Sequence, residues 1–253
     1  MKALIPHRLE SLLLAALNPS LGWLRCTRGV SLRGAARLRW LKKMGHFAGV
    51  TQVVDAGANE GAFARSVAAV LPEAAVYCFE PVPATFARLQ RNTAALPNVE
   101  LANVALGPAR AQVPMYTCPL DEANSLLRGT RALTDAWNET APTGQVEVEV
   151  WPLDDFLAGK KAPGKCFLKA DVQGYELELL KGAAATLRRC ALLQLETSLV
   201  PLYESAPTLP QLWQFVVDAG FEFLMLGDVL TSRQNRQPVS CDLYFSKPAR
   251  LDP

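Results

Sequence analysis

The chain has 253 residues, of which half are apolar and a fifth are charged, and its formal net charge is +2. This length suits one substantial α/β domain with an appendage and is too short for two full enzymatic domains. No apolar run approaches the about 20 residues of a membrane-spanning helix. Residues 12–17 are also a poor secretory signal, because Glu10 precedes them and no small-residue cleavage site follows. We therefore expect a cytoplasmic protein.

The cysteines are widely spaced and form no Cys-x-x-Cys pair. Several lie within apolar runs, where a thiol is buried rather than paired or bound to zinc. The pattern favours reduced thiols over disulfides or a metal site. The six are Cys26, Cys78, Cys118, Cys166, Cys190 and Cys241.

Residues 1–46 are predicted to form a helical N-terminal cap. Residues 1–43 hold nine Lys or Arg and one acidic residue, a balance of +8, whereas the rest of the chain carries −6. Such asymmetry is typical of a segment that meets an anionic surface, so one interpretation is peripheral contact with the inner face of an anionic membrane. We favour the other interpretation, a cap with an exposed basic face that packs on the domain through Trp23, Leu38 and Trp40.

Residues 47–253 alternate short apolar runs with amphipathic segments, which predicts an α/β domain with a doubly wound sheet of seven strands, the last one antiparallel. The predicted strands cover residues 52–55, 75–80, 99–105, 166–171, 191–196, 222–226 and 242–246. The predicted helices cover residues 4–45, 62–71, 83–95, 175–189 and 208–219.

The interval from about residue 108 to residue 155 departs from this alternation. Residues 113–117 and 146–150 alternate apolar and polar side chains, as half-exposed strands do. We expect a small β insertion that folds over the carboxyl edge of the sheet, where ligands bind in folds of this class.

The first predicted strand ends in a pattern typical of nucleoside-binding proteins. Residues 53–61 read Val-Val-Asp-Ala-Gly-Ala-Asn-Glu-Gly, and about twenty residues later the second strand ends at Glu80. A strand, glycine turn, helix and second strand bind a nucleoside when the terminal carboxylate accepts the ribose hydroxyls. The alternative is that the glycines are only turn residues and Glu80 only a solvated strand end.

The turn favours S-adenosylmethionine over a dinucleotide. A dinucleotide site requires Gly-x-Gly-x-x-Gly. The second glycine lets the pyrophosphate approach the backbone, and the third lets the following helix pack closely on the strand. This chain has Gly57 and Gly61 but places Asn59 and Ala62 at positions where glycine would stand. Asp55 would repel a pyrophosphate in a partly buried cleft, yet it suits the ammonium group of a methionine tail. An NAD-linked oxidoreductase is therefore the disfavoured alternative.

A second block, residues 167–183, runs from an apolar strand through Asp171 and a turn into an amphipathic helix. Because the carboxyl ends of parallel strands meet at one edge of a sheet, this block brings Lys169 and Asp171 to the edge where Asp55 and Glu80 also lie. We expect the chemistry of the site at this edge.

Together these blocks resemble the FkbM family of S-adenosylmethionine-dependent methyltransferases, over roughly residues 52–225. The resemblance implies a class I methyltransferase with a Rossmann-like sheet, acting on a hydroxyl of a sugar, a glycan or glycolipid, or another natural product. The N-terminal 45 residues lie outside it. The matching blocks are Asp55–Gly61, Phe79–Pro83, Asn103–Gly107, Val150–Phe156 and Leu168–Glu176.

By matching position, the resemblance also implies the residues of an S-adenosylmethionine site. Lys169 and Asp171 match the most characteristic block, beside the transferred methyl group. Ser125 of the insertion is a further candidate for contact with the cofactor. The positions implied for the methionine end are Asp55, Gly57, Asn59, Glu60 and Gly61. Those implied for the ribose and adenine side are Glu80, Pro81, Asn103 and Val104.

Methyl transfer to a hydroxyl requires a base for its proton, and Asp171 is the candidate. Both histidines, His7 and His46, lie outside the motif blocks. Glu176 and Glu196 are supporting residues or, with a substrate oxygen, Mg²⁺ ligands in an alternative that we do not favour. Asp171 also has a structural alternative, in which it caps the following helix.

The sequence thus predicts an O-methyltransferase whose acceptor is a small molecule or glycan, with no nucleic-acid partner and no metal. The rival from another class is a catalytically inactive nucleoside-binding protein that docks to a membrane or glycan assembly through the basic cap. The presence of both Lys169 and Asp171 argues against this rival.

Overall fold

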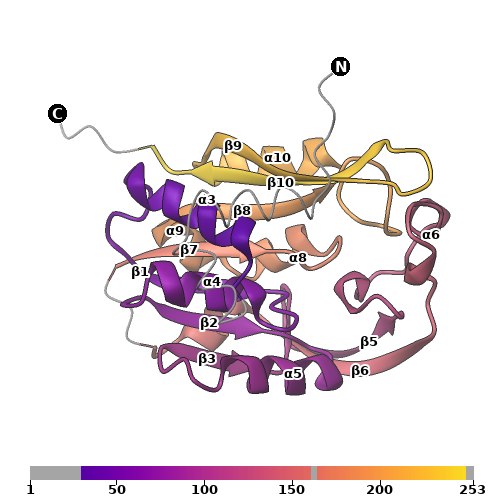
Figure 1. The fold of residues 1–253 in the computed structure, drawn as a ribbon, viewed down its shortest axis with the longest axis horizontal. Coiled ribbons are helices and arrows are strands. Elements are labelled where there is room, and N and C mark those ends of the chain that lie inside the picture. Colours follow the sequence, from indigo (N-terminus) through magenta and orange to yellow (C-terminus); the bar gives the residue numbers. More distant parts are fainter. Residues whose placement is uncertain (1–29, 161–163, 249–253) are drawn as a thin grey trace.

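The computed structural model describes residues 30–160 and 164–248. The strands of its main sheet are β1 (Val50–Ala56), β2 (Ala75–Phe79), β3 (Val99–Ala102), β7 (Lys165–Ala170), β8 (Cys190–Ser198), β9 (Glu222–Thr231) and β10 (Pro238–Ser246). Their order is β3-β2-β1-β7-β8-β10-β9 (Figure 1). Neighbours from β3 to β8 are parallel, and β10 is antiparallel to β8 and β9. This confirms the doubly wound seven-strand sheet with an antiparallel last strand.

Helices cover both faces of this sheet. They are α3 (Leu32–Lys43), α4 (Ala62–Val70), α5 (Pro83–Thr93), α7 (Leu153–Leu157), α8 (Glu176–Lys181), α9 (Ala184–Arg189) and α10 (Leu209–Asp218). Successive strand residues point to opposite sides: Phe167 packs with residues of α3 and α4, and Leu168 with residues of α7 to α10. Because both faces are buried, the strands are continuous apolar runs.

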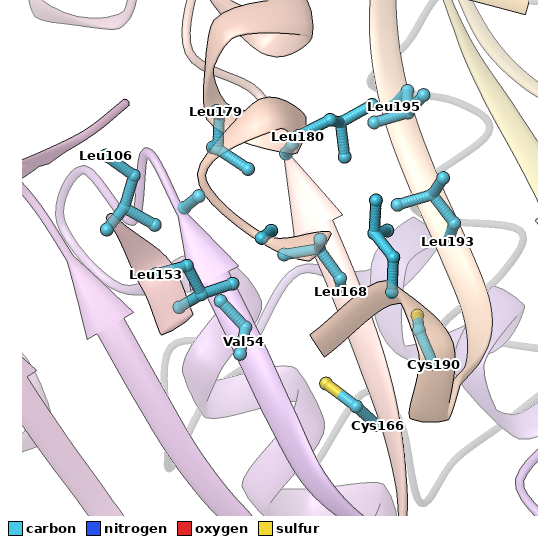
Figure 2. Packing of buried hydrophobic residues seen from close by; sticks show 14 of the residues in the cluster. Val54, Leu106, Leu153, Cys166, Leu168, Leu179, Leu180, Cys190, Leu193 and Leu195 are labelled. Carbon is cyan, nitrogen blue, oxygen red and sulfur yellow. The ribbon is translucent and has the colours of Figure 1, made fainter. Parts of the chain in front are cut away.

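The larger apolar cluster lies on the face covered by α7 to α10. Figure 2 shows Val54, Leu168 and Leu193 of three adjacent strands with Leu179 and Leu180 of α8. All five side chains are fully buried. This packing fixes the ends of β1, β7 and β8, where the predicted site residues stand.

Two predicted elements differ in the structure. The strand expected over residues 99–105 ends at Ala102, and the chain then leaves the sheet to form β4 (Ala105–Leu106), which pairs with β6 (Gly144–Trp151) of a second sheet. The single helix expected over residues 175–189 is two helices separated at Gly182. A Cβ at Gly182 would lie 2.0 Å from the carbonyl oxygen of Gly107, so a close backbone approach interrupts the helix there.

The insertion has the predicted β character. Its strand β5 (Ala111–Thr117) pairs antiparallel with β6, which completes a three-stranded sheet in the order β4-β6-β5. The connection holds η1 (Asp121–Ala123), α6 (Arg131–Ala136) and η2 (Asn138–Thr140). Met115 and Val148 of this sheet pack on Val82, which precedes α5, so the insertion lies beside the end of β2.

Of the predicted N-terminal cap, the structure describes α3 and the residues that follow it. Leu38 is buried, as expected, whereas Trp40 is 44% exposed and does not pack on the domain as predicted. Arg37 forms an ion pair with Asp228 at 2.8 Å. Trp23 and the rest of the cap lie outside the described residues, and the boundary at residue 46 remains a prediction.

Two further sequence expectations concern thiols and membrane spans. The five cysteines in the described part of the chain are all free and buried, which confirms the prediction for them; Cys26 lies outside it. Within residues 30–160 and 164–248, no helix combines the length and apolar character needed to cross a bilayer.

Candidate active site

Two glycines shape the turn after β1, and each has a positive φ. At Gly57 (φ +72°) a Cβ would lie 1.8 Å from the carbonyl oxygen of Asp171, so only glycine lets this turn touch the end of β7. At Gly61 (φ +83°) a Cβ would lie 2.8 Å from Leu89 Cδ1 of α5. Gly57 therefore serves the site itself, whereas Gly61 serves helix packing.

Glu80 stands at the end of β2 and is held by backbone amides. Asn59 N donates to its Oε2 and Val82 N to its Oε1, each at 3.0 Å. Burial raises the pKa of Glu80 to about 6, and the two amides counteract that rise. A carboxylate offers about four acceptor positions, so two remain for a ligand after the amides are counted. The solvated-strand-end alternative is thus wrong, because Glu80 is 7% exposed.

Asn103 has a different place from the one implied by the resemblance. Its Nδ2 donates to the carbonyl oxygens of Glu80 (2.8 Å) and Pro81 (2.9 Å), so its amide holds the turn after β2. Pro81 and Val104 line the cavity beside this turn, whereas Asn103 does not. Asn103 therefore positions the carboxylate of Glu80 rather than facing a base.

Lys169 is 6% exposed and joins the ends of β1 and β7. Its Nζ lies 3.1 Å from Asp55 Oδ1 and 3.5 Å from Asp171 Oδ2, and it donates to the carbonyl oxygen of Gly57 at 2.8 Å. Burial acts to lower the pKa of Lys169, but the two carboxylates outweigh it and raise that pKa above its ordinary value. Lys169 is therefore a permanent cation that neutralises two acids.

Asp55 is fully buried behind this cation and lines none of the cavities of the site. Burial raises its pKa, and Lys169 counteracts the rise. This corrects the expectation that Asp55 faces a ligand: its role is that of counterion to Lys169, because the turn at Gly57 closes over it.

Gln173 links the candidate base to a second carboxylate. Its Nε2 donates to Asp171 Oδ1 at 2.7 Å and to Glu196 Oε2 at 2.5 Å, and its Oε1 accepts from the hydroxyl of Tyr203 at 2.6 Å. Ser240 donates to the other oxygen of Glu196 at 3.1 Å. An amide nitrogen thus occupies the space between the two carboxylates that a cation would need.

The two carboxylates of this network differ in protonation. Burial acts to raise the pKa of Asp171, but Lys169 and the hydrogen bonds from Glu196 and Gln173 lower it below its ordinary value. Burial, and then the charge of Asp171, raise the pKa of Glu196 well above its ordinary range. Lys169 therefore favours the ionised form of Asp171, whereas burial and the charge of Asp171 disfavour ionisation of Glu196.

Three cavities meet at Asp171. The first lies between the turns after β1 and β2 and the insertion, and Glu80, Val104 and Met115 line it. The second, of about 390 Å³, lies between the ends of β7 and β8 and α6. The third, also about 390 Å³, extends from the turn after β1 toward α3. Asp171 and Glu122 line all three.

The remaining predicted residues are brought to the same edge in different roles. Asn59 lines the first and third cavities and Glu60 the third, where Glu60 is paired with Arg88 at 2.7 Å. Ser125 is buried and donates to the carbonyl oxygen of Gln173 at 2.7 Å, so it ties the insertion to the β7 turn. It lines none of the three cavities, which leaves no direct ligand contact for it.

Glu176 begins α8 and holds the turn that precedes it. Its Oε1 accepts from Val172 N at 3.0 Å and Gly174 N at 3.2 Å. Burial raises its pKa to about 7, against the pull of these amides. Glu176 therefore holds the amide of Gly174 that Asp171 was considered to cap, and within the described residues α8 itself has no side-chain cap hydrogen bond.

Sequence reasoning missed three residues of the site. They are Glu122, Trp137 and Tyr203, and none of them belongs to a motif block. Trp137 and Tyr203 line the second cavity together with Arg233. Gln173 was not singled out either, and its positive φ of +56°, like that of Asn59 (φ +45°), marks an enforced geometry that only the structure reveals.

Comparison with known proteins identifies the family. The model of the methyltransferase FkbM domain matches residues 55–223, more than half of the chain. The chain belongs to the FkbM methyltransferase family. The match begins at Asp55 and ends in β9, so it spans the residues that hold Glu80 and Asp171, whereas Ser240, which bonds to Glu196, lies beyond it.

Curated relatives are methyltransferases too. The chain is 27% identical over 188 residues to the 2-O-methyltransferase NoeI of Sinorhizobium fredii, which covers 70% of this chain and 77% of NoeI. It is 30% identical over 193 residues to methyltransferase sdnD of Sordaria araneosa, covering 67% of this chain and 73% of sdnD. Among solved structures, the N-terminal domain of EvdMO1 with SAH and D-fucose is 14% identical, with a TM-score of 0.46 over 86% of this chain and 83% of that one.

Proposed function

We propose that this methyltransferase uses S-adenosylmethionine and methylates a hydroxyl group of a sugar, glycan or related natural product. The observation that carries the proposal is the convergence of three cavities on Asp171. A methyl donor that occupies the first and third cavities and an acceptor in the second would meet at this carboxylate.

The residues of the first cavity fit an adenosine. Glu80 keeps acceptor positions for ribose hydroxyls because only two amides use its oxygens. The walls are largely apolar, which suits a flat base; they include Phe79, Val104, Leu106, Met115 and Leu126. Gly57 and Asn59 line both the first and the third cavity, so a methionine tail would follow the turn after β1 toward α3.

The bound cofactor would supply an electrophilic methyl group on a sulfonium centre. The chain would hold the acceptor oxygen in line with this methyl group, and one of its side chains would accept the proton of the acceptor hydroxyl. Asp171 is the ionised carboxylate at the junction, and Gln173 and Lys169 fix its two oxygens from opposite sides. Positioning of this kind supplies much of the rate in a bimolecular transfer, and a positioned base adds about 10²–10⁴-fold.

The second cavity suits a polyhydroxylated acceptor. The aromatic residues Trp137 and Tyr203 line it. The polar residues Glu196, Ser240 and Arg233 line it as well. Apolar faces with a few convergent polar groups are the usual lining of a small-molecule site. The name of the relative NoeI, a 2-O-methyltransferase, supports transfer to oxygen.

Calorimetry on the purified chain tests the cofactor. S-adenosylmethionine and S-adenosylhomocysteine should bind, and NAD should not. Transfer from labelled S-adenosylmethionine to a panel of glycans and glycolipids then tests the acceptor. Binding of NAD in preference to S-adenosylhomocysteine would contradict the proposal, and cofactor binding without transfer to any acceptor would favour the inactive-binder alternative.

A further inference from the structure

The end of the sheet opposite the active site carries a broad basic groove. It has a volume of about 910 Å³ and lies where β7 and β8 begin and β10 ends. Basic side chains line it, with Glu222 as the acid among them. The basic residues are Lys165, Arg188, Arg189 and Lys247.

Two of these charges, those of Lys165 and Arg188, are not neutralised within the described part of the chain. Lys165 and Arg188 are exposed and make no ion pair with any described residue. Arg189 has a buried guanidinium nitrogen without a hydrogen-bond partner there. A buried guanidinium nitrogen without a hydrogen-bond partner is costly, so an anion that reaches this nitrogen would remove that cost.

Apolar side chains lie at the rim. Met44 lines the groove and is 56% exposed, and Trp40 contacts His46 of the groove with 6.3 Å between ring centroids. Tryptophan beside basic residues is the side-chain combination that lies at membrane–water interfaces, where the ring meets the headgroup level and the cations meet anionic lipids.

This groove is distinct from the basic character seen in the N-terminal sequence. Arg37 of α3 is paired with Asp228, and Lys42 Nζ donates to the carbonyl oxygen of Val70 at 2.7 Å. Those two cations serve the fold. The groove instead collects cations from three elements that are far apart in sequence.

We propose that this basic groove, with Trp40 and Met44 at its rim, docks the enzyme on anionic phospholipid headgroups. Charge complementarity supports this occupant, since Lys165 and Arg188 are exposed in a groove that Arg189 and Lys247 also line and that holds one acid, Glu222. The groove is also open and wide, which fits a surface of many headgroups better than one enclosed anion. When the enzyme docks in this way, the carboxyl edge of the sheet, with Glu80 and Asp171, faces away from the bilayer.

Co-sedimentation of the full chain with vesicles tests the proposal. Binding is expected to phosphatidylcholine vesicles that contain phosphatidylglycerol and not to phosphatidylcholine alone. It should be lost at about 1 M salt, where the screening length falls to about 3 Å. Equal binding to both vesicle types would overturn the proposal, as would full competition by inorganic phosphate at millimolar concentration, which would indicate a discrete anion site. Binding of single-stranded RNA without binding of vesicles would also overturn it.

Charge reversals locate the surface. Lys165→Glu with Arg188→Glu should weaken vesicle binding at least about 25-fold, since each basic residue near an anionic surface contributes roughly fivefold. Arg128→Glu with Arg131→Glu makes the same change in charge at the opposite end and should leave binding within about twofold. Melting temperature and S-adenosylhomocysteine affinity should be unchanged in both variants. Equal vesicle binding by the two variants would contradict the assignment to this groove.

Discussion

The two halves of the active site are built by different means. On the β1 and β2 side, Glu80 is held by the backbone amides of Asn59 and Val82. On the β7 and β8 side, Asp171 is held by the side chains of Lys169 and Gln173. The first half therefore depends on the path of the main chain, whereas the second half depends on side chains that come from several strands and loops.

The difference affects how each half tolerates substitution. A carboxylate held by amides keeps its geometry when distant side chains change, and within residues 30–160 and 164–248 no side chain donates to the oxygens of Glu80. A side-chain network fails when one member is removed, because the remaining buried groups lose their partners. We therefore expect the largest effects of single substitutions on the β7 side.

Lys169→Met should have the largest effect on stability. Removal of one partner from a buried ion pair costs about 3–5 kcal/mol, because the other charge stays buried without compensation. Here that charge is Asp55, which is fully buried. Chemical denaturation measures the loss. Adding Asp55→Asn should recover part of it, and a double variant no more stable than Lys169→Met would show that Asp55 and Lys169 are not coupled.

Asp171→Asn should lower turnover by about 10²-fold or more, because the amide keeps the shape of the side chain but cannot accept the proton. Cofactor affinity and melting temperature should change little. Single-turnover transfer from labelled S-adenosylmethionine measures the effect. The exposed Asp135→Asn is the matched control and should retain full activity; full activity in Asp171→Asn would place the base elsewhere.

Glu80→Gln should weaken S-adenosylhomocysteine binding at least about tenfold, since hydrogen bonds to a charged acceptor contribute about 1.5–3 kcal/mol each. The exposed Glu147→Gln is the control and should leave affinity unchanged. Glu60→Gln is the comparison within the site: Glu60 lines the third cavity but is paired with Arg88, and we expect less than about a twofold change. Calorimetry distinguishes the three. A larger effect at Glu60 would assign the ligand carboxylate to the β1 turn instead.

The affinity of the wild-type chain should also depend on pH through Glu80. Its pKa is about 6, raised by burial, so the carboxylate that accepts the hydroxyls becomes protonated as the pH falls through that value. We expect affinity to fall by about tenfold per pH unit below pH 6. The dependence should be absent in Glu80→Gln. An affinity that is constant from pH 5 to pH 8 in the wild type would contradict the role of Glu80.

Tyr203→Phe should have the smallest effect. It removes the hydrogen bond to Gln173 Oε1, so the amide is held only through its Nε2 and orients Asp171 less firmly, without a change in charge. A hydrogen bond of this kind is worth about 0.5–1.5 kcal/mol, which corresponds to a roughly two- to tenfold lower turnover. The acidic limb of the pH profile of kcat/KM should also move to higher pH. A Gln173 amide that is held less firmly stabilises the ionised form of Asp171 less, which raises the pKa of Asp171. An unchanged profile would make Tyr203 merely structural.

Local sequence predicted the fold well where structure follows from periodicity. The parallel strands are buried on both faces, so continuous apolar runs identify them in the sequence. The acids that stand at strand ends can then be located from the ends of these runs. Prediction failed where two distant segments touch. The strand expected to continue to residue 105 ends at Ala102 because Asn103 bonds to the turn after Glu80, and α8 ends at Gly182 because the backbone of Gly107 lies against it.

By itself, the sequence determined the order of elements, the glycine turn, the strand-end carboxylates and the family. Each of these depends on short motifs and on the order of those motifs along the chain. The tertiary structure alone decided what those residues do. It turned Asp55 into the counterion of Lys169 and placed Gln173 between two carboxylates. It also gathered Lys165, Arg188 and Lys247 into one groove. The physical reason is that burial and charge pairing depend on neighbours in space, which strand pairing and loop packing bring together.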